Sequence, residues 1–169
     1  QLQEDQMIYQ FLNRLDEKFG FETAQAHCDI PCGIYDPSTA QIAALTVVRM
    51  MDLMAELAGG AEKDNVDFHN KMGRYVASKE EHAEKAKHEI RVIWGDYFKK
   101  DAHPNVDDLV HKIMQLGSKV RQTADREAGV AFVAAINEFA EAFWATKNVK
   151  TKKAKAPYAP ALEMVYPDL

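Results

Sequence analysis

Four stretches in which apolar residues recur at helical spacing fill most of this chain, and they constrain its fold more than any other feature. They begin near Asp36, near Asp64 or Asn65, after the turn His103-Pro104-Asn105 and after a break around residues 123–125. No β-type alternation of useful length competes with them. Short connections favour antiparallel neighbours, so the sequence predicts an all-α fold, an up-down four-helix bundle.

The ends and inner faces of the helices follow from the same pattern. The first helix should begin at Asp36, a good N-cap followed by Pro37, and end near Ala58. The second should extend to about Phe98. Helix by helix, the predicted buried positions are Ala43, Val47, Met50, Met54 and Leu57; Phe68, Met72, Tyr75, His82, Ala86, Ile90, Ile93 and Tyr97; Leu109, Ile113, Leu116 and Val120; and Phe132, Ile136, Phe139 and Phe143.

Two terminal segments differ from the bundle. Residues 1–26 predict a short amphipathic leader helix with a local charge of −3, and they end in Ala24-Gln25-Ala26, which resembles a processing site. A helix that simply docks on the bundle fits these residues equally well, but the motif that follows favours a removable leader. Residues 148–169 combine lysines with prolines, which predicts an extended tail. The predicted organisation is therefore a leader (1–26), a metal-binding hook plus bundle (27–147) and a tail (148–169).

Composition excludes several classes of function. A net charge of −5 argues against a nucleic-acid binder. No run approaches the roughly 18 consecutive apolar residues of a membrane span, so no membrane partner is expected. Two cysteines are too few for a disulfide framework. We expect a reducing, cytoplasmic location in which the thiols serve chemistry.

The segment that carries the chemistry is His27-Cys28-Asp29-Ile30-Pro31-Cys32, which runs on into Gly33-Ile34-Tyr35-Asp36-Pro37. Cleavage before His27 would release an α-amine beside an imidazole, a backbone amide nitrogen and the two cysteine thiols. Nitrogen donors combined with anionic sulfur suit a redox-active nickel ion in a square plane better than a structural zinc ion. Before cleavage the His27 nitrogen is an amide and a poor ligand, so the uncut chain should be inactive.

The residues around these donors have expected roles of their own. Gly33 permits a sharp exit toward the first helix. The phenol of Tyr35 is the nearest candidate proton donor. One alternative remains open from the residues alone, namely a non-enzymatic helical bundle that binds zinc or copper through Cys28 and Cys32. It explains the thiols but not the position of His27 behind a cleavable stretch.

Residues 27–37 resemble the hook of the nickel superoxide dismutase family, His-Cys-Asp-x-Pro-Cys-Gly-x-Tyr-Asp-Pro, at every specified position. Trp94-Gly95-Asp96-Tyr97-Phe98-Lys99 and Phe143-Trp144-Ala145-Thr146-Lys147 resemble two further stretches of that family. The resemblance covers roughly residues 27–147. It implies a four-helix subunit in a homohexamer, with a nickel ion that alternates between divalent and trivalent states while superoxide becomes oxygen and hydrogen peroxide.

The resemblance also implies roles for single residues. The metal ligands would be His27, Cys28 and Cys32. Asp29 and Tyr35 would order the pocket, Tyr97 would partner Tyr35, and Lys99 would attract the anionic substrate. A protease that cuts before His27 and a nickel-delivery factor are further expected partners.

The chain departs from the family at two positions. Ala43 and His82 stand where many members have a glutamate and an arginine that hold the axial imidazole. The orientation of the His27 imidazole is therefore expected to come from another group, such as the Ile34 carbonyl or His82.

Overall fold

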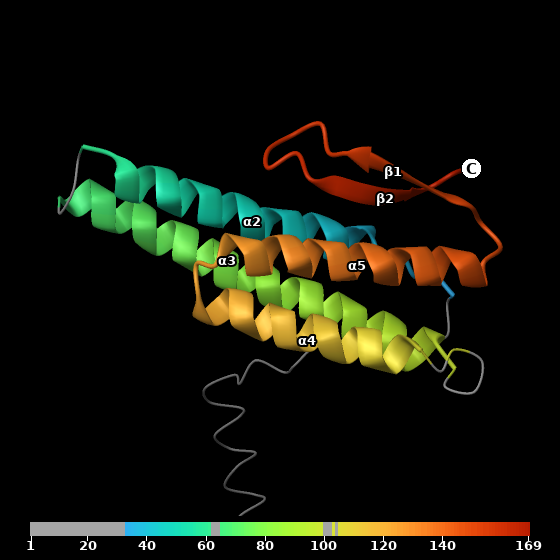
Figure 1. Ribbon diagram of the computed structural model, residues 1–169. Helices are drawn as coiled ribbons and strands as arrows, with labels where there is room; N and C mark the ends of the chain where they lie inside the picture. Colours follow the sequence, from blue (N-terminus) through green and yellow to red (C-terminus); the bar gives the residue numbers. More distant parts are fainter. Residues whose placement is uncertain (1–32, 62–64, 100–102, 104) are drawn as a thin grey trace, which may run out of the picture. The chain divides into compact units, whose positions relative to one another are not determined.

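The helices lie where the sequence predicts them. The computed structural model describes residues 33–61, 65–99, 103 and 105–169. Within these residues the helices are α2 (Ser38–Gly59), α3 (Val66–Val92), the π-helix η1 (Ile93–Tyr97), α4 (Val106–Gln122) and α5 (Arg126–Thr146). Figure 1 shows α2, α3, α4 and α5 as antiparallel neighbours in a bundle. The predicted all-α, up-down architecture is confirmed.

Side-chain caps fix the starts of three of these helices. Asp36 Oδ1 accepts a hydrogen bond from the Ser38 amide at 2.8 Å, and Pro37 is already helical with φ −73°. Asn65 and Asp125 accept backbone amides of α3 and α5 in the same way. These bonds satisfy N–H groups that a first turn leaves without an intrahelical acceptor. Local sequence therefore determines where the helices begin.

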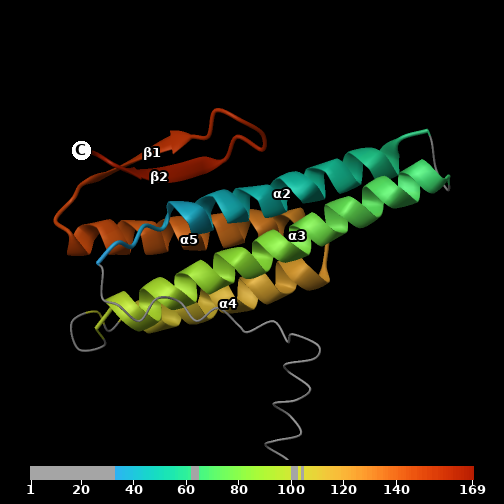
Figure 2. The same cartoon turned by 180° about the vertical axis from the view of Figure 1, so that it is seen from behind.

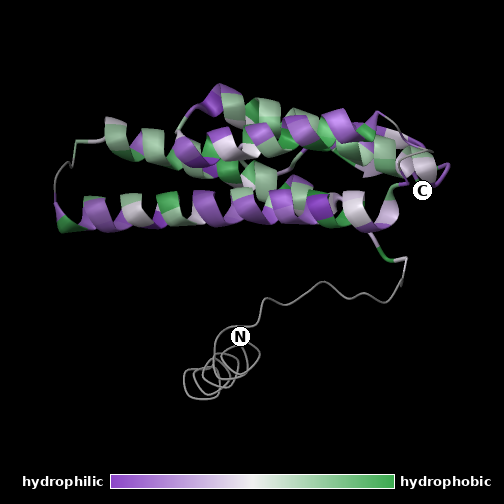
Figure 3. Ribbon diagram, turned by 90° about the horizontal axis from the view of Figure 1, so that it is seen from below, coloured by the Kyte–Doolittle hydropathy of each residue, from purple (hydrophilic) through white to green (hydrophobic). Residues whose placement is uncertain are grey.

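The core lies between the helices and is richest along α5. The four predicted phenylalanine and isoleucine positions of α5 are fully buried, as are Ile113 and Val120 of α4. Figure 3 shows hydrophobic and hydrophilic residues alternating along the helices, as amphipathic segments require. The inner faces predicted for α4 and α5 therefore hold, with Leu109 and Leu116 only partly buried.

The predicted inner face of α2 is correct only in its first half. Ala43 and Val47 are buried, whereas Met50, Met54 and Leu57 are only partly buried. Figures 1 and 2 show the connected ends of α2 and α3 running beyond the ends of α4 and α5. The last turns of α2 therefore have fewer neighbouring helices than periodicity alone suggests.

Helix α5 is apolar because it is a core helix. Its length and composition alone, with a mean hydropathy of 1.2 over its most apolar window, would allow a membrane span. However, 56% of that window is buried inside the protein. The bundle thus accounts for its composition.

The tail is extended as predicted, and its two extended segments pair with each other. Strands β1 (Thr151–Lys155) and β2 (Glu163–Pro167) form an antiparallel hairpin with Thr151 opposite Pro167. Figures 1 and 2 show this hairpin on the side of the bundle formed by α2 and α5. Met164 and Val165 are buried there, so the tail packs on its own chain.

Two buried polar side chains attach the hairpin to the helices. Gln41 of α2 donates to Asn137 Oδ1 at 2.9 Å and to the Val165 carbonyl at 3.1 Å. Asn137 of α5 donates to the Glu163 carbonyl at 2.8 Å. Burying amides without such partners would be costly. The hairpin is thus part of the packed structure.

Candidate active site

The predicted metal ligands His27, Cys28 and Cys32, together with Asp29, lie outside the described residues. The described chain starts at Gly33, whose φ of +72° lies in the left-handed region that favours glycine. The sharp exit expected at this residue is therefore present. Over residues 33–61, 65–99, 103 and 105–169, no group of three or more His, Cys, Asp or Glu side chains could hold a metal ion.

The structure brings together Tyr35 and Tyr97, two of the predicted catalytic residues. Their ring centroids lie 5.7 Å apart, with the planes tilted by 51°. The Tyr97 ring also packs against Phe143 at 5.0 Å and edge-on against Phe98 at 5.4 Å. Tyr35 is three residues after Cys32 in the sequence, so the chain leads from the hook directly into this aromatic cluster through Tyr35.

Tyr97 is positioned by a π-helical turn that the sequence reasoning did not predict. The Phe98 amide bonds to the Ile93 carbonyl at 3.3 Å, which is an i to i+5 bond. A π-turn contains one more residue than an α-turn, so it changes the direction of the side chains that follow, and such turns are frequent at functional sites. The one local signal was Gly95, a poor helix former inside an otherwise periodic segment.

The end of α5 supplies two neighbours of Tyr97 to which the sequence reasoning gave no role. The Tyr97 hydroxyl lies 2.5 Å from Thr146 Oγ1. The Lys147 Nζ lies 4.6 Å from the centre of the Tyr97 ring and 5.6 Å from that of Phe143. A cation over an aromatic face is attracted by the ring quadrupole. One positive charge, just beyond the end of α5, therefore lies over the Tyr97 ring.

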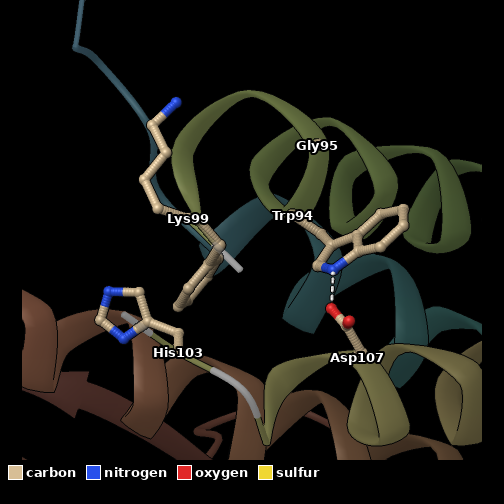
Figure 4. A pocket seen from close by; sticks show the side chains of 6 residues that line it. Trp94, Gly95, Lys99, His103 and Asp107 are labelled. Atoms are coloured by element: carbon tan, nitrogen blue, oxygen red, sulfur yellow. Dashed lines mark hydrogen bonds between the residues drawn. The ribbon is translucent and has the colours of Figure 1, made fainter. Parts of the chain in front are cut away.

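Lys99 is exposed and lies two residues beyond Tyr97. It lines a pocket of about 270 Å³ together with Trp94, His103 and Asp107. Trp94 Nε1 donates to Asp107 Oδ1 at 2.8 Å, and Figure 4 shows the Lys99 side chain pointing away from this bond. Lys99, the residue expected to attract the anionic substrate, is therefore exposed to solvent.

His82 is a partly buried residue of α3, and its hydrogen bonding restricts the role proposed for it. Its Nδ1 lies 2.8 Å from the Ser78 carbonyl oxygen. Since a carbonyl only accepts, Nδ1 carries a proton and Nε2 of the neutral ring is an acceptor. Ala43, the other departure from the family pattern, is 2% exposed in the core. A neutral His82 can therefore hold another imidazole only by accepting a hydrogen bond from it.

Comparison with known proteins identifies a family and several relatives. Residues 22–147 match the family described as nickel-containing superoxide dismutase. The "Superoxide dismutase [Ni]" of Streptomyces seoulensis is 35% identical over 126 residues, which is 73% of this chain and 89% of that protein. The protein of the same name from Streptomyces coelicolor is 35% identical over 129 residues, covering 75% of this chain and 92% of the relative.

Solved structures agree with the sequence relatives. The native structure of a nickel superoxide dismutase matches with a TM-score of 0.61 and 34% identity, over 72% of this chain and 99% of that one. A structure with nickel ligation of the oxidised state matches with a TM-score of 0.62, 34% identity and the same coverage. The matched residues 22–147 include the hook and all four helices α2 to α5, whereas the β-hairpin lies beyond them. This chain belongs to the nickel-containing superoxide dismutase family.

Proposed function

We propose that this protein is a nickel superoxide dismutase, which converts two superoxide anions and two protons into oxygen and hydrogen peroxide. The observation that carries the proposal is the family match over residues 22–147, in which the hook and the helical bundle occur together. The two relatives named above match this chain over 89% and 92% of their own lengths, and both are called superoxide dismutase.

The donors in the hook fit nickel. Cys28 and Cys32 would supply soft, anionic thiolates, and His27 would supply its α-amine and imidazole, with the Cys28 amide nitrogen as a further donor. Imidazole nitrogen is a ligand that suits nickel, whereas calcium and magnesium prefer oxygen ligands and do not select thiolates. Nickel bound there supplies one-electron chemistry by alternating between divalent and trivalent states.

The remaining roles fall to Asp29 of the hook and to side chains of the bundle. Tyr35 would hold a proton close to the ligands for transfer to reduced substrate, and Asp29 would help to order the pocket. The Tyr97 ring, 5.7 Å from that of Tyr35, would restrict its orientation. Lys99 and Lys147 would attract the superoxide anion.

We also propose that the leader works as a switch. Cutting before His27 would convert an amide nitrogen into an amine that can bind a metal, which requires a protease and is compatible with a nickel-delivery factor. Loss of residues 1–26, which carry a charge of −3, would change the net charge from −5 to −2. This change favours the approach of an anion.

A cytoplasmic homohexamer is the proposed working form. Reduced thiols require a reducing compartment. Burial in subunit contacts would cover apolar residues of α3 such as Val66, which is 84% exposed, and Val76. Sedimentation of the nickel-loaded, cut chain tests the hexamer, and a monomeric mass would refute it.

The competing hypothesis is a non-enzymatic bundle that binds zinc or copper through Cys28 and Cys32. The family match does not favour it. Loading separate samples of the cut chain with nickel, zinc and copper and following superoxide decay by stopped flow distinguishes the two. The proposed function requires rapid decay with nickel alone, and equal inactivity of all three samples would refute it.

Substrate steering by Lys99 should appear in the salt dependence of the reaction. We expect Lys99→Met to lower kcat/KM by about two- to tenfold at low ionic strength, with the difference shrinking as salt is added. The matched control is Lys71→Met on α3, which removes the same charge from an exposed position. The part of α3 between Lys71 and Val92 alone is about 30 Å long at 1.5 Å per residue, and Lys99 lies beyond its end. A kcat/KM of Lys99→Met that equals that of Lys71→Met at every salt concentration would exclude steering by Lys99.

A further inference from the structure

We infer that the Tyr97 hydroxyl donates its hydrogen bond to Thr146, so that the Tyr97 oxygen faces the reaction as a hydrogen-bond acceptor and not as a proton donor. Thr146 is then a positioning residue, because it acts through Tyr97. The inference rests on the proposed function for its catalytic meaning. The hydrogen bonds that carry it lie entirely in the helical bundle.

The direction of these hydrogen bonds follows from counting protons. Thr146 Oγ1 has two short contacts, at 2.7 Å to the Phe143 carbonyl oxygen and at 2.5 Å to the Tyr97 hydroxyl. A threonine hydroxyl has one proton and a carbonyl has none. Thr146 must therefore donate to Phe143, and Tyr97 must donate to Thr146.

The end of α5 explains why Thr146 donates to this carbonyl. The Lys147 amide bonds to the Trp144 carbonyl at 3.0 Å instead of continuing the α-helical pattern to Phe143. The last carbonyls of a helix lack intrahelical partners, and the threonine hydroxyl satisfies the one at Phe143. The direction of the hydrogen bond between Tyr97 and Thr146 is thus determined by the way in which α5 ends.

The surroundings of the Tyr97 ring hold the phenol in this arrangement. Phe143 and Tyr35 contact the ring at centroid distances of 5.0 Å and 5.7 Å, and the Lys147 ammonium lies 4.6 Å from its centre. A phenol that donates its O–H to one partner can still accept a hydrogen bond from another through its oxygen. Tyr97 can therefore orient a protonated neighbour, while the proton for peroxide comes from another donor, such as Tyr35 or water.

Raman spectroscopy tests the direction of the bond without nickel or activity. The tyrosine Fermi doublet reports whether a phenol donates or accepts, and subtracting the spectrum of Tyr97→Phe from that of the full, nickel-free chain isolates Tyr97. We expect a donor-type doublet that Thr146→Val shifts and Thr146→Ser restores. An acceptor-type doublet in the unchanged chain, or an identical one in Thr146→Val, would overturn the inference. The spectrum of the unchanged chain needs no threonine variant, so it tests the bond direction even if Thr146→Val folds poorly.

Kinetics then test the positioning role in the cut, nickel-loaded protein. We expect Thr146→Val to lower kcat/KM by about three- to tenfold, the worth of one hydrogen bond, and Thr146→Ser to recover most of it. Thr46→Val is the matched control, because within the described part of the chain the Thr46 hydroxyl bonds only to the Ile42 carbonyl of its own helix, at 3.0 Å. A Thr146→Val value equal to that of Thr46→Val would overturn the positioning role. Absence of dismutation in the unchanged protein would instead refute the proposed function, and the Raman result would still decide the bond direction.

Discussion

Replacing Cys28 or Cys32 by serine is expected to abolish both nickel retention and superoxide dismutation. A serine hydroxyl keeps its proton at neutral pH and is a hard donor, whereas the proposed site depends on soft thiolates. Loss of a group that only supports a ligand commonly lowers metal affinity by 10- to 100-fold, so loss of a ligand should cost at least about 100-fold. The fold should be unaffected in the nickel-free state, because the described core is built from residues after Gly33.

Metal analysis after desalting and stopped-flow superoxide decay measure the two effects. Ile30→Val is the matched control, since position 30 is one of the two unspecified positions of the hook motif and lies between the two cysteines. It should keep nickel and activity. Stoichiometric nickel with normal decay rates in either serine variant would exclude that cysteine as a ligand.

The second large effect is expected at Lys79, a buried lysine of the bundle. Its side chain is 3% exposed, and its Nζ donates to the carbonyls of Val120 and Arg121 at 2.6 Å each and of Thr123 at 3.2 Å. It also lies 3.2 Å from Glu80 Oε1. The ammonium thereby satisfies the last carbonyls of α4 and places positive charge at the negative end of that helix.

We expect Lys79→Met to lower the free energy of unfolding by about 3 kcal/mol. Methionine fills a similar volume, so most of the loss comes from buried carbonyls left without a donor, at about 1–3 kcal/mol each before relaxation. Lys71→Met, at an exposed position of the same helix, should change stability by less than about 0.5 kcal/mol. Urea denaturation of the nickel-free chain measures both variants. Equal denaturation midpoints for the two variants would show that the hydrogen bonds of Lys79 do not stabilise the fold.

Acid should weaken the same region of the structure. Burial raises the pKa of Glu80, but hydrogen bonds from Arg121 and Lys79 outweigh it, so the pKa lies below its usual 4.5. Burial also raises the pKa of Glu84, but the hydrogen bond from Arg91 and nearby positive charges outweigh it, so this pKa is lowered as well. Carboxylates of this kind stabilise the fold above their unfolded pKa, and the stabilisation is lost as the pH falls through the folded value.

The expected result is a fall in unfolding free energy below about pH 4.5, the usual pKa of glutamate. The Glu80→Gln variant should show a shallower fall, because it has no proton to bind at that position. Urea denaturation between neutral and acid pH measures both slopes. Identical slopes for the two proteins would exclude Glu80 as a contributor.

The sequence predicts the helices well because their signals are local. Asp36, Asn65 and Asp125 cap helices within three residues, and the phenylalanines of α5 repeat at helical spacing. Burial of the last turns of α2 depends instead on how far other helices extend. Helical periodicity does not contain that information.

The features that the sequence did not predict depend on distant contacts. Gln41 and the Val165 carbonyl are 124 positions apart, so the pairing and docking of the hairpin could not be inferred from a run of lysines and prolines. Likewise, the π-turn directs Tyr97 toward Thr146, which lies 49 positions away. The hook donors, in contrast, are recognisable from the sequence because all of them lie within six consecutive residues.

The central claim is that an α-amine released at His27 joins two thiolates around one nickel ion. The most direct test compares a chain that begins at His27 with one that begins at Ala26, because both lack the leader and only the first has the amine on His27. With one equivalent of nickel each, the chain beginning at His27 should dismutate superoxide rapidly, and the chain beginning at Ala26 should be no faster than nickel-free protein. Equal rates for the two chains would contradict the account.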